Sequence, residues 1–350
     1  MPRRKKKSRR KKKSLFTHKK VSKPKFMLGI PTDSEWKTMQ NFASFVVADE
    51  EGNPHEFSIH QTAFILPEGV LSDTLHHPTA YWIGKIKQIR ARNDEDVWAL
   101  VQWYWSPQEV NSVIKSFDVS GCGQYERIMS DYYDYVSTAS FCDHATVMRY
   151  DERAVDQKVF DSDHFYCRFD LEYRARRILP SIKSIACRCG VCYNPDRDPV
   201  MHFCPSPGCR AAYHQECLRR PKEKLDSTAR DRKLIENWPD TDKSLSIEDL
   251  ASSRPCRKRR KGPSIPDPLE QFPDALVKAA QQQIVKGVQA GGVVGNVKAV
   301  VAARQLIYCC LLKGSPLPTD WKDKIDVEAA IPPDRKSTLV FVCPQCKNLI

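Results

Sequence analysis

The chain has 350 residues, 14 cysteines and a formal net charge of +13. Residues 1–25 hold 14 lysines and arginines and no acidic residue, so the remainder carries 42 basic and 43 acidic side chains. This near-neutral remainder argues against a uniformly basic nucleic-acid-binding fold. No run of 18 apolar residues occurs, so we expect no membrane-spanning helix, and no apolar segment of the secretory type follows the basic start.

Residues 1–30 are predicted to form a disordered basic tail, because such a composition cannot bury apolar surface and repels itself. Clustered basic residues are typical of a nuclear localisation signal and of an arm that contacts DNA without sequence preference. The same composition also fits a tail that only promotes solubility.

Residues 35–178 alternate between apolar, aromatic-rich segments and breaks made of Gly, Pro, Asn and Asp. The segments with strand character are His55–Leu66, Tyr81–Ile89, Val97–Trp105, Ala145–Tyr150 and Phe165–Glu172. Strands without long helical patterns between them favour an antiparallel barrel or sandwich. We therefore expect a mainly β domain here.

Residues 218–267 are polar and contain a second basic block, Arg254–Lys261, which predicts a linker with a second cluster of the nuclear-import type. A helical repeat follows, with apolar residues at every fourth position: Phe272, Leu276, Ala280, Ile284 and Val288. After Gly291-Gly292 a second apolar series begins at Val293. We predict a pair of helices joined by a glycine turn within residues 272–313, and a protein partner for them.

The cysteines point to metal binding, because no export signal accompanies them and a reducing compartment disfavours disulfides. Eight Cys and His residues form four pairs with ligand-like spacing: Cys187/Cys189, Cys204/Cys209, His214/Cys217 and Cys343/Cys346. Structural zinc takes four such ligands per ion. The sequence therefore predicts two structural Zn²⁺, with Cys192 as an alternative to Cys187 in the first pair.

The order of these ligands resembles a PHD finger, as do Tyr193-Asn-Pro-Asp196, Tyr213 before His214, and Phe341 before Cys343. The resemblance implies a cross-brace in which the first and third pairs share one ion and the second and fourth share the other. It places the finger at residues 185–350 with an insertion at 218–342. A RING-like, zinc-dependent ubiquitin ligase scaffold has a related ligand order and is the alternative.

The aromatic hairpin Tyr81–Ile89 and Val97–Val110 resembles that of a BAH domain, and Met129–Asp134 and Phe165–Asp170 match further segments of the family. The finger that follows makes the whole similar to the BAH–PHD chromatin proteins of plants and fungi, including fungal effectors of Polycomb-type repression. The resemblance implies a nuclear, non-enzymatic chromatin reader that supports transcriptional repression. No catalytic motif is present, and we predict no catalytic residue. A DNA-binding adaptor dominated by the basic tail is a further alternative.

Strand alternation places Trp103 and Trp105 on one face, where they are either part of the barrel core or two walls of an aromatic cage. A trimethylammonium has no N–H to donate and is held by cation–π attraction and dispersion. The BAH resemblance implies a cage of Tyr81, Trp103 and Trp105 for trimethylated lysine 27 of histone H3, with Asp134 and Tyr132 contacting the histone peptide. Trp82 and Trp98 are expected in the core. In the finger, Ala186 and Ala212 occupy positions where readers of trimethylated lysine 4 carry aromatic residues, so we predict no binding of that mark.

Overall fold

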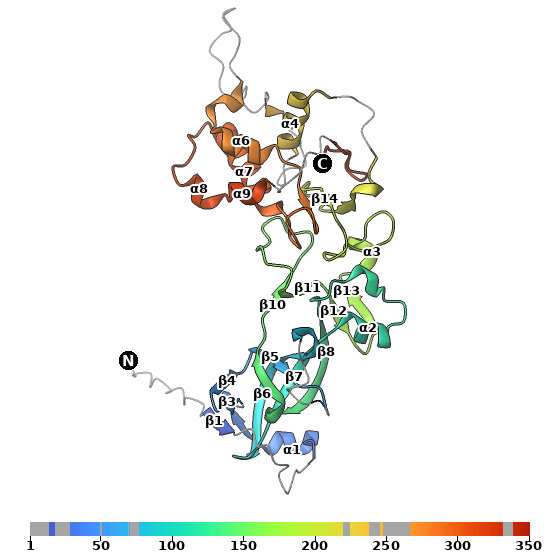
Figure 1. Cartoon of the computed structure of the whole chain (residues 1–350), viewed down its shortest axis with the longest axis vertical. Coiled ribbons are helices and arrows are strands. Elements are labelled where there is room, and N and C mark those ends of the chain that lie inside the picture. Colours follow the sequence, from blue (N-terminus) through green and yellow to red (C-terminus); the bar gives the residue numbers. More distant parts are fainter. Residues whose placement is uncertain are drawn as a thin grey trace, which may run out of the picture. The chain divides into compact units, whose positions relative to one another are not determined.

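A computed structural model describes residues 14–17, 29–49, 51–68, 70, 77–219, 225–237, 246–247, 267–331 and 339–350. The chain divides into two compact units (Figure 1). The first contains residues up to 117, together with 125–149 and 165–179; the second contains 118–124, 150–164 and 180–350. Two segments of the predicted β domain, 118–124 and 150–164, thus belong to the second unit. No helix in the described part of the chain is long and apolar enough to cross a membrane.

The first unit is built on an eight-stranded, mostly antiparallel sheet, in which β6, β7 and β8 lie side by side (Figure 1). Its strands in spatial order are β13 (Arg177–Leu179), β12 (Asp170–Glu172), β8 (Ile128–Ser137), β7 (Asp96–Trp105), β6 (Trp82–Asn93), β5 (Thr62–Ile65) and β9 (Phe141–His144), with β2 (Gln40–Phe42) paired to β6. The unit is therefore mainly β, as expected.

Smaller sheets and two capped helices complete the first unit. One sheet joins β1 (Ser14–Thr17), β3 (Ser44–Ala48) and β4 (Pro54–Ser58), and the other joins β10 (Val147–Arg149) and β11 (Phe165–Cys167). The helices α1 (Asp33–Thr38) and α2 (Pro107–Val113) each begin with a capping box. Such a box satisfies two N–H groups that the first helical turn leaves unpaired.

The hydrophobic core of the first unit forms where the sheets face each other. Phe45, Phe57 and Phe141 are fully buried and contact one another through their rings, with centroids 5.0–5.5 Å apart. Trp98 is buried, as expected, but Trp82 is 40% exposed, so its assignment to the core was wrong.

Two further differences from the expected elements lie in the first unit. Residues 55–66 do not form one strand: they are divided between β4 and β5, which lie in different sheets, and His60 between them adopts a left-handed φ of 78°. Within the predicted disordered tail, Ser14–Thr17 pair in parallel with β3; this segment carries two apolar residues inside the basic run. The rest of the tail up to residue 28 lies outside the described residues.

The second unit combines a small sheet with a helical cluster. The sheet has the order β15 (Ala212–His214), β14 (Met201–Phe203) and β16 (Val285–Lys286), and all its pairs are antiparallel. The helices are α3 (Ile182–Ile185), α4 (Ser227–Glu236), α6 (Asp274–Ala280), α7 (Val297–Lys313), α8 (Trp321–Lys324) and α9 (Val327–Ala330). The cluster of α6, α7 and α9 packs around fully buried Val300, Ala303 and Ile307 of α7.

The predicted helix pair within 272–313 needs correction. The first helix ends at Ala280, Val285–Lys286 form a strand, and the second helix begins at Val297 and not at Val293. The four-residue repeat continued through Ile284, but pairing with β14 outweighs helix propensity there. Within the predicted linker 218–267, α4 is a helix, because Asp226 caps it and Leu234 and Ile235 are buried. The basic block Arg254–Lys261 lies outside the described residues.

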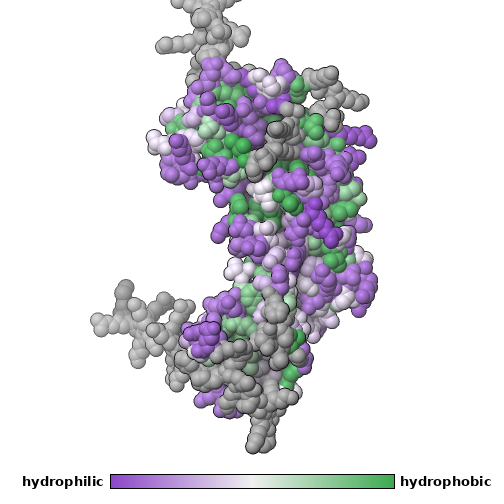
Figure 2. Space-filling model, viewed as in Figure 1, coloured by the Kyte–Doolittle hydropathy of each residue, from purple (hydrophilic) through white to green (hydrophobic). Residues whose placement is uncertain are grey.

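On the face drawn in Figure 2, hydrophilic residues dominate the described surface of each unit, and hydrophobic residues are scattered among them in small groups. Single apolar residues on a surface are ordinary. The sites below therefore rest on named side chains and their contacts.

Candidate functional site

The aromatic site lies on β7 where its register with β8 breaks. Gln102 faces Tyr133, and Tyr104 faces Met129, so three residues of β8 lie opposite Trp103 alone. A bulge of this kind bends its strand and re-aims the side chains around it. Trp103 and its neighbours on β8 therefore leave the simple alternation of a flat sheet.

Short hydrogen bonds hold this bulge in place. Gln102 Nε2 donates to the Ser130 carbonyl at 2.8 Å, and the Tyr132 amide donates to Ser130 Oγ at 2.9 Å. The Asp131 carboxylate accepts the Tyr173 amide at 2.7 Å, which ties the bulge to the end of β12. The site is thus supported by its own polar contacts before any ligand arrives.

Trp103 is a half-buried ring with a fixed orientation. Its Nε1 donates to the Asp134 carboxylate at 2.9 Å, and its ring meets Trp82 edge-on at 5.6 Å. Gly84 lies directly opposite on β6, where an added Cβ would lie 2.2 Å from Val101. A larger residue at position 84 would therefore clash with the core beneath this part of the sheet.

Trp105 belongs to a second aromatic group. Its ring lies 6.2 Å from Tyr132 and 5.4 Å from Tyr173, and those two tyrosines lie 4.7 Å apart. The negative charge of Asp134, followed by burial, raises the pKa of Tyr132 above its ordinary value, so its hydroxyl keeps its proton. Tyr173 was not predicted as a site residue.

Tyr81, the third predicted wall, precedes β6 and rests on Phe64, with ring centroids 5.7 Å apart. Among the described residues, each of the rings of Tyr81, Trp103 and Trp105 contacts an aromatic ring outside this trio and none contacts another member of it. No face of these rings is therefore covered by another member of the predicted cage. Burial of the Tyr81 hydroxyl raises its pKa above the ordinary value for tyrosine, so this ring carries no charge at neutral pH.

The first metal-ligand group contains Cys187, Cys189, His214 and Cys217, whose ligand atoms all lie within 4.8 Å of one another. The turn after α3 supplies the first two, and β15 with the following turn supplies the others. His214 Nδ1 lies 3.5 Å from Cys189 Sγ and 3.9 Å from Cys217 Sγ. These values suit a tetrahedral ion, for which Zn–S bonds of about 2.3 Å place sulfurs about 3.8 Å apart.

Asp198 orients the imidazole of His214 from the other side. His214 Nε2 lies 3.2 Å from the Asp198 carboxylate, which leaves Nδ1 turned toward the thiols. Carboxylates in this position set the ring orientation of metal-binding histidines. Without a metal, the bond to Asp198 and then the bond to Cys187 raise the pKa of His214 to about 11. For Cys187, burial raises the pKa, and the contacts with His214 and backbone amides outweigh it, lowering the pKa to about 6.

The second group contains Cys204, Cys209, Cys343 and Cys346, also within 4.8 Å of one another. Cys204 Sγ lies 3.4 Å from Cys346 Sγ, and Cys209 Sγ lies 3.5 Å from Cys343 Sγ. The structure thus brings the first pair to the third and the second pair to the fourth. Cys192 lies outside both groups, with its sulfur directed to the Ile182 carbonyl.

Both ligand groups have the chemistry that Zn²⁺ prefers. Each provides four S or N donors, and the thiolates and the carboxylate-oriented imidazole leave no position that water must fill. The clusters can therefore hold metal ions. A third cluster within the described residues, Asp161, Asp163 and His164, lies on the surface, and exposed acidic groups of this kind are often found together without an ion.

Two known proteins are similar in sequence to part of this chain. No family model matches the chain. It is 24% identical over 137 residues to "Chromatin remodeling protein EBS" of Arabidopsis thaliana, which covers 39% of this chain and 55% of that protein. "Chromatin remodeling protein SHL" of the same plant is 26% identical over 118 residues, covering 34% and 48%. The chain is homologous to these chromatin remodeling proteins.

The matches span about half the length of each of these relatives. Among solved structures, the yeast Rsc2 BAH domain matches with a TM-score of 0.26 and 12% identity, covering 38% of this chain and 51% of that one.

Proposed function

We propose that the chain is a nuclear chromatin reader whose first unit binds trimethylated lysine on the histone H3 tail, with lysine 27 as the mark. Tyr81, Trp103 and Trp105 would form the walls around the methylammonium. The observation that carries the proposal is the Trp103 ring, half-buried and held by Asp134. Homology to two chromatin remodeling proteins supports it.

The contacts of the three rings suit a cage because each ring is already immobilised. Tyr81 rests on Phe64, Trp103 is bonded to Asp134, and Trp105 packs on Tyr173. Rings that are fixed before binding lose little conformational freedom on capturing a cation. Each desolvated ring contributes about 0.5–2 kcal/mol of cation–π attraction.

Asp134 would serve the site twice. Its carboxylate positions the Trp103 indole, and its charge lies beside the ring that would face the cation. Tyr132, 36% exposed next to Trp105, offers a hydroxyl and a ring edge to the residues that flank the methyl-lysine. These two side chains are the proposed contacts of the histone peptide.

Titration of a panel of methylated H3 peptides tests the proposal. The wild type should bind the trimethylated peptide more tightly than the unmodified one, and Trp103→Ala should weaken that binding about 2- to 30-fold, the loss of one ring. Tyr133→Ala is the matched control, because Tyr133 is an exposed aromatic on the neighbouring strand β8 and is not one of the three walls. Equal binding of methylated and unmodified peptides by the wild type would refute the proposal.

We propose further that each Cys/His group holds one structural Zn²⁺ in a PHD-type cross-brace. Metal analysis of the purified chain should give two zinc ions per molecule, with cadmium substitution producing thiolate charge-transfer absorption. A single ion, or none in protein that is fully folded, would contradict this.

Binding and not catalysis is the proposed mode of action, with support of Polycomb-type transcriptional repression as its outcome. The basic tail would add loose contacts to DNA. A zinc-dependent ubiquitin ligase is the rival class, and an autoubiquitination assay with a set of conjugating enzymes separates the two. Zinc-dependent ubiquitin transfer by the chain would favour the rival.

A further inference from the structure

One edge of the finger's sheet is covered by a strand from a distant part of the chain. Met201 and His202 of β14 pair with Lys286 and Val285 of β16, some 84 positions later in sequence. The pairing continues beyond the strand: the Phe203 amide donates to the Ile284 carbonyl at 2.9 Å. Val288 and Gln289 donate to the Asp198 and Pro199 carbonyls, both at 3.0 Å. Backbone hydrogen bonds to residues 198–203 are therefore found from one end of the segment 284–289 to the other.

On its other side, this segment is hydrogen-bonded to the chain that follows it. The Val285 amide donates to Asn296 Oδ1 at 2.8 Å, and the Val285 carbonyl accepts the Asn296 amide at 3.1 Å. Gly295 has φ +67°, and a Cβ there would lie 1.9 Å from the Val285 carbonyl oxygen. The glycine-rich stretch 287–295, expected as a turn between two helices, thus lets the chain fold closely around β16.

Lys286 carries the side-chain part of this contact, and it is 1% exposed. Its Nζ donates to the Tyr150 hydroxyl at 2.9 Å and lies 3.4 Å from the Glu152 carboxylate. The ammonium also lies over the ring of Tyr193, 4.5 Å from its centroid. Two aromatic rings, one hydroxyl and one carboxylate therefore surround a single primary ammonium.

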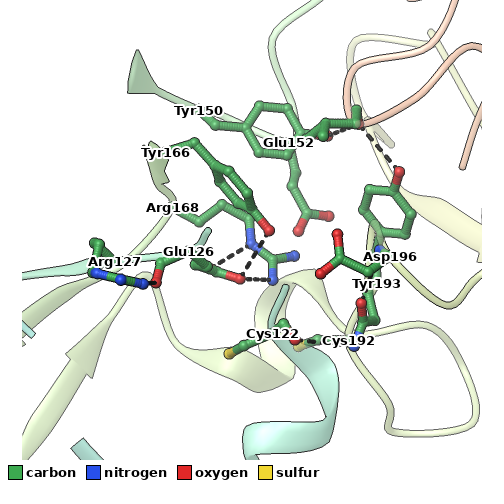
Figure 3. A network of polar contacts seen from close by, with 12 residues as sticks. Cys122, Glu126, Arg127, Tyr150, Glu152, Tyr166, Arg168, Cys192, Tyr193 and Asp196 are labelled. Atoms are coloured by element: carbon green, nitrogen blue, oxygen red, sulfur yellow. Dashed lines mark hydrogen bonds and ion pairs between the residues drawn. The ribbon is translucent and has the colours of Figure 1, made fainter. Parts of the chain in front are cut away.

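The walls of this pocket are themselves fixed. Tyr150 and Tyr193 are both drawn in Figure 3, and their hydroxyls donate to the Val293 carbonyl at 3.1 and 3.2 Å. Tyr193 follows the first ligand pair, and Tyr150 and Glu152 come from the segment 150–164 that belongs to the second unit. Segments far apart in sequence thus build one lysine-binding pocket.

A free strand edge and an aromatic, acidic pocket are the two features by which proteins capture an extended, lysine-bearing peptide. We propose that residues 284–289 are a built-in ligand of the finger: they occupy the β14 edge, and Lys286 fills a pocket of Tyr150, Glu152 and Tyr193 that is specific for a primary ammonium. The finger then binds no external lysine peptide at this edge. Instead, the edge of β14 holds the finger's own insertion in place through residues 284–289. This inference goes beyond the reader function of the first unit and does not depend on it.

Chemical complementation of the zinc-loaded, full-length chain tests the pocket. Lys286→Ala removes three carbons and an ammonium, which n-propylammonium can replace. The variant should melt several degrees below the wild type, and n-propylammonium at tens of millimolar should restore part of that loss, whereas n-propanol should not. Lys278→Ala, an exposed lysine on α6, is the matched control and should respond to neither. An equal response to the alcohol, or no response to the amine, would overturn the proposal.

Two further measurements apply if Lys286→Ala does not fold. Lys286→Met keeps the pocket filled, so it should be less stable than the wild type and gain nothing from the amine; rescue of this variant would count against a specific pocket. In wild-type protein, the amides of Phe203, Val288 and Gln289 should exchange hydrogen slowly, with or without a synthetic peptide of residues 283–290. Fast exchange of these amides in an otherwise protected finger, or displacement by the peptide, would refute a built-in strand. Binding of trimethylated H3 peptide should be unchanged in every Lys286 variant, which separates this test from that of the first unit.

Discussion

The ion pair between Arg168 and Glu126 gives the sharpest test of how the first unit is stabilised. The two side chains are 1% and 0% exposed, and the guanidinium donates to both carboxylate oxygens, at 2.8 and 2.6 Å (Figure 3). The Tyr166 hydroxyl adds a third bond to Glu126 at 3.3 Å. Arg168→Met would keep most of the volume and leave the carboxylate buried without its bidentate partner. Loss of one partner of a buried pair costs about 3–5 kcal/mol, a large share of the roughly 5–15 kcal/mol that holds a domain together.

Urea unfolding, followed by tryptophan fluorescence, measures this cost. Arg168→Met should lower the free energy of unfolding of the first unit by about 3–5 kcal/mol. The double variant Glu126→Gln/Arg168→Met should recover a substantial part, because it removes the charge that the single variant leaves uncompensated. Arg177→Met is a matched control, since the Arg177 side chain is 63% exposed in its pair with Glu172 and exposed pairs contribute about 1 kcal/mol or less. The reasoning would fail if the double variant were as unstable as the single one.

Four further outcomes are expected. Asp134→Asn should keep the acceptor for Trp103 and weaken methyl-peptide binding less than Asp134→Ala, as measured by calorimetry; the reverse order would remove the positioning role. Gly295→Ala should destabilise the second unit by more than the roughly 1–3 kcal/mol of a strained φ, whereas Gly292→Ala, with a similar φ and no neighbour within 4 Å, should stay in that range in thermal unfolding. Chelation of zinc, or Cys346→Ser, should unfold the second unit and leave the first unit's transition in place, so loss of both would contradict independent units. Deletion of residues 1–13, which keeps strand β1, should flatten the salt dependence of DNA binding without changing peptide selectivity, and a selectivity change would assign the tail a role in recognition.

Ligand spacing predicted which Cys and His residues lie together because covalent geometry and donor chemistry are local properties. Pairs separated by one to four residues can reach one ion whatever the rest of the chain does. The sequence left Cys187 and Cys192 as alternatives, and the structure places Cys187 in the first group and directs Cys192 elsewhere. Asp198 could have been suspected only from its position after the Tyr-Asn-Pro-Asp stretch, since nothing in its spacing marks a histidine partner.

Long-range pairing accounts for what was not predicted. β8 is an interior strand of the sheet, yet its bulge and its run of Ser, Asp and Tyr conceal the usual alternation. The contact of Tyr173 with Trp105 depends on β12 pairing with that same strand, so no local pattern could reveal it. For β16 the local pattern was misleading, because a helical repeat extended into residues whose conformation is decided by β14.

The insertion between Cys217 and Cys343 matters energetically because much of it is folded. If the insertion were an unstructured loop of that length, bringing the ligands of the second cluster together would cost a few kcal/mol of chain entropy. Here Asn237, at the end of α4, donates to the Leu349 carbonyl and accepts from Ser206, beside Cys204. Buried Arg304 of α7 donates to the Asn237 carbonyl in turn. The helical cluster therefore holds the fourth ligand pair next to the second pair through packed contacts. In the proposed two-zinc finger, the folded insertion already holds Cys343 and Cys346 close to Cys204 and Cys209 before the second ion binds. Substitutions that unfold the insertion should therefore also lower the affinity of this site for metal.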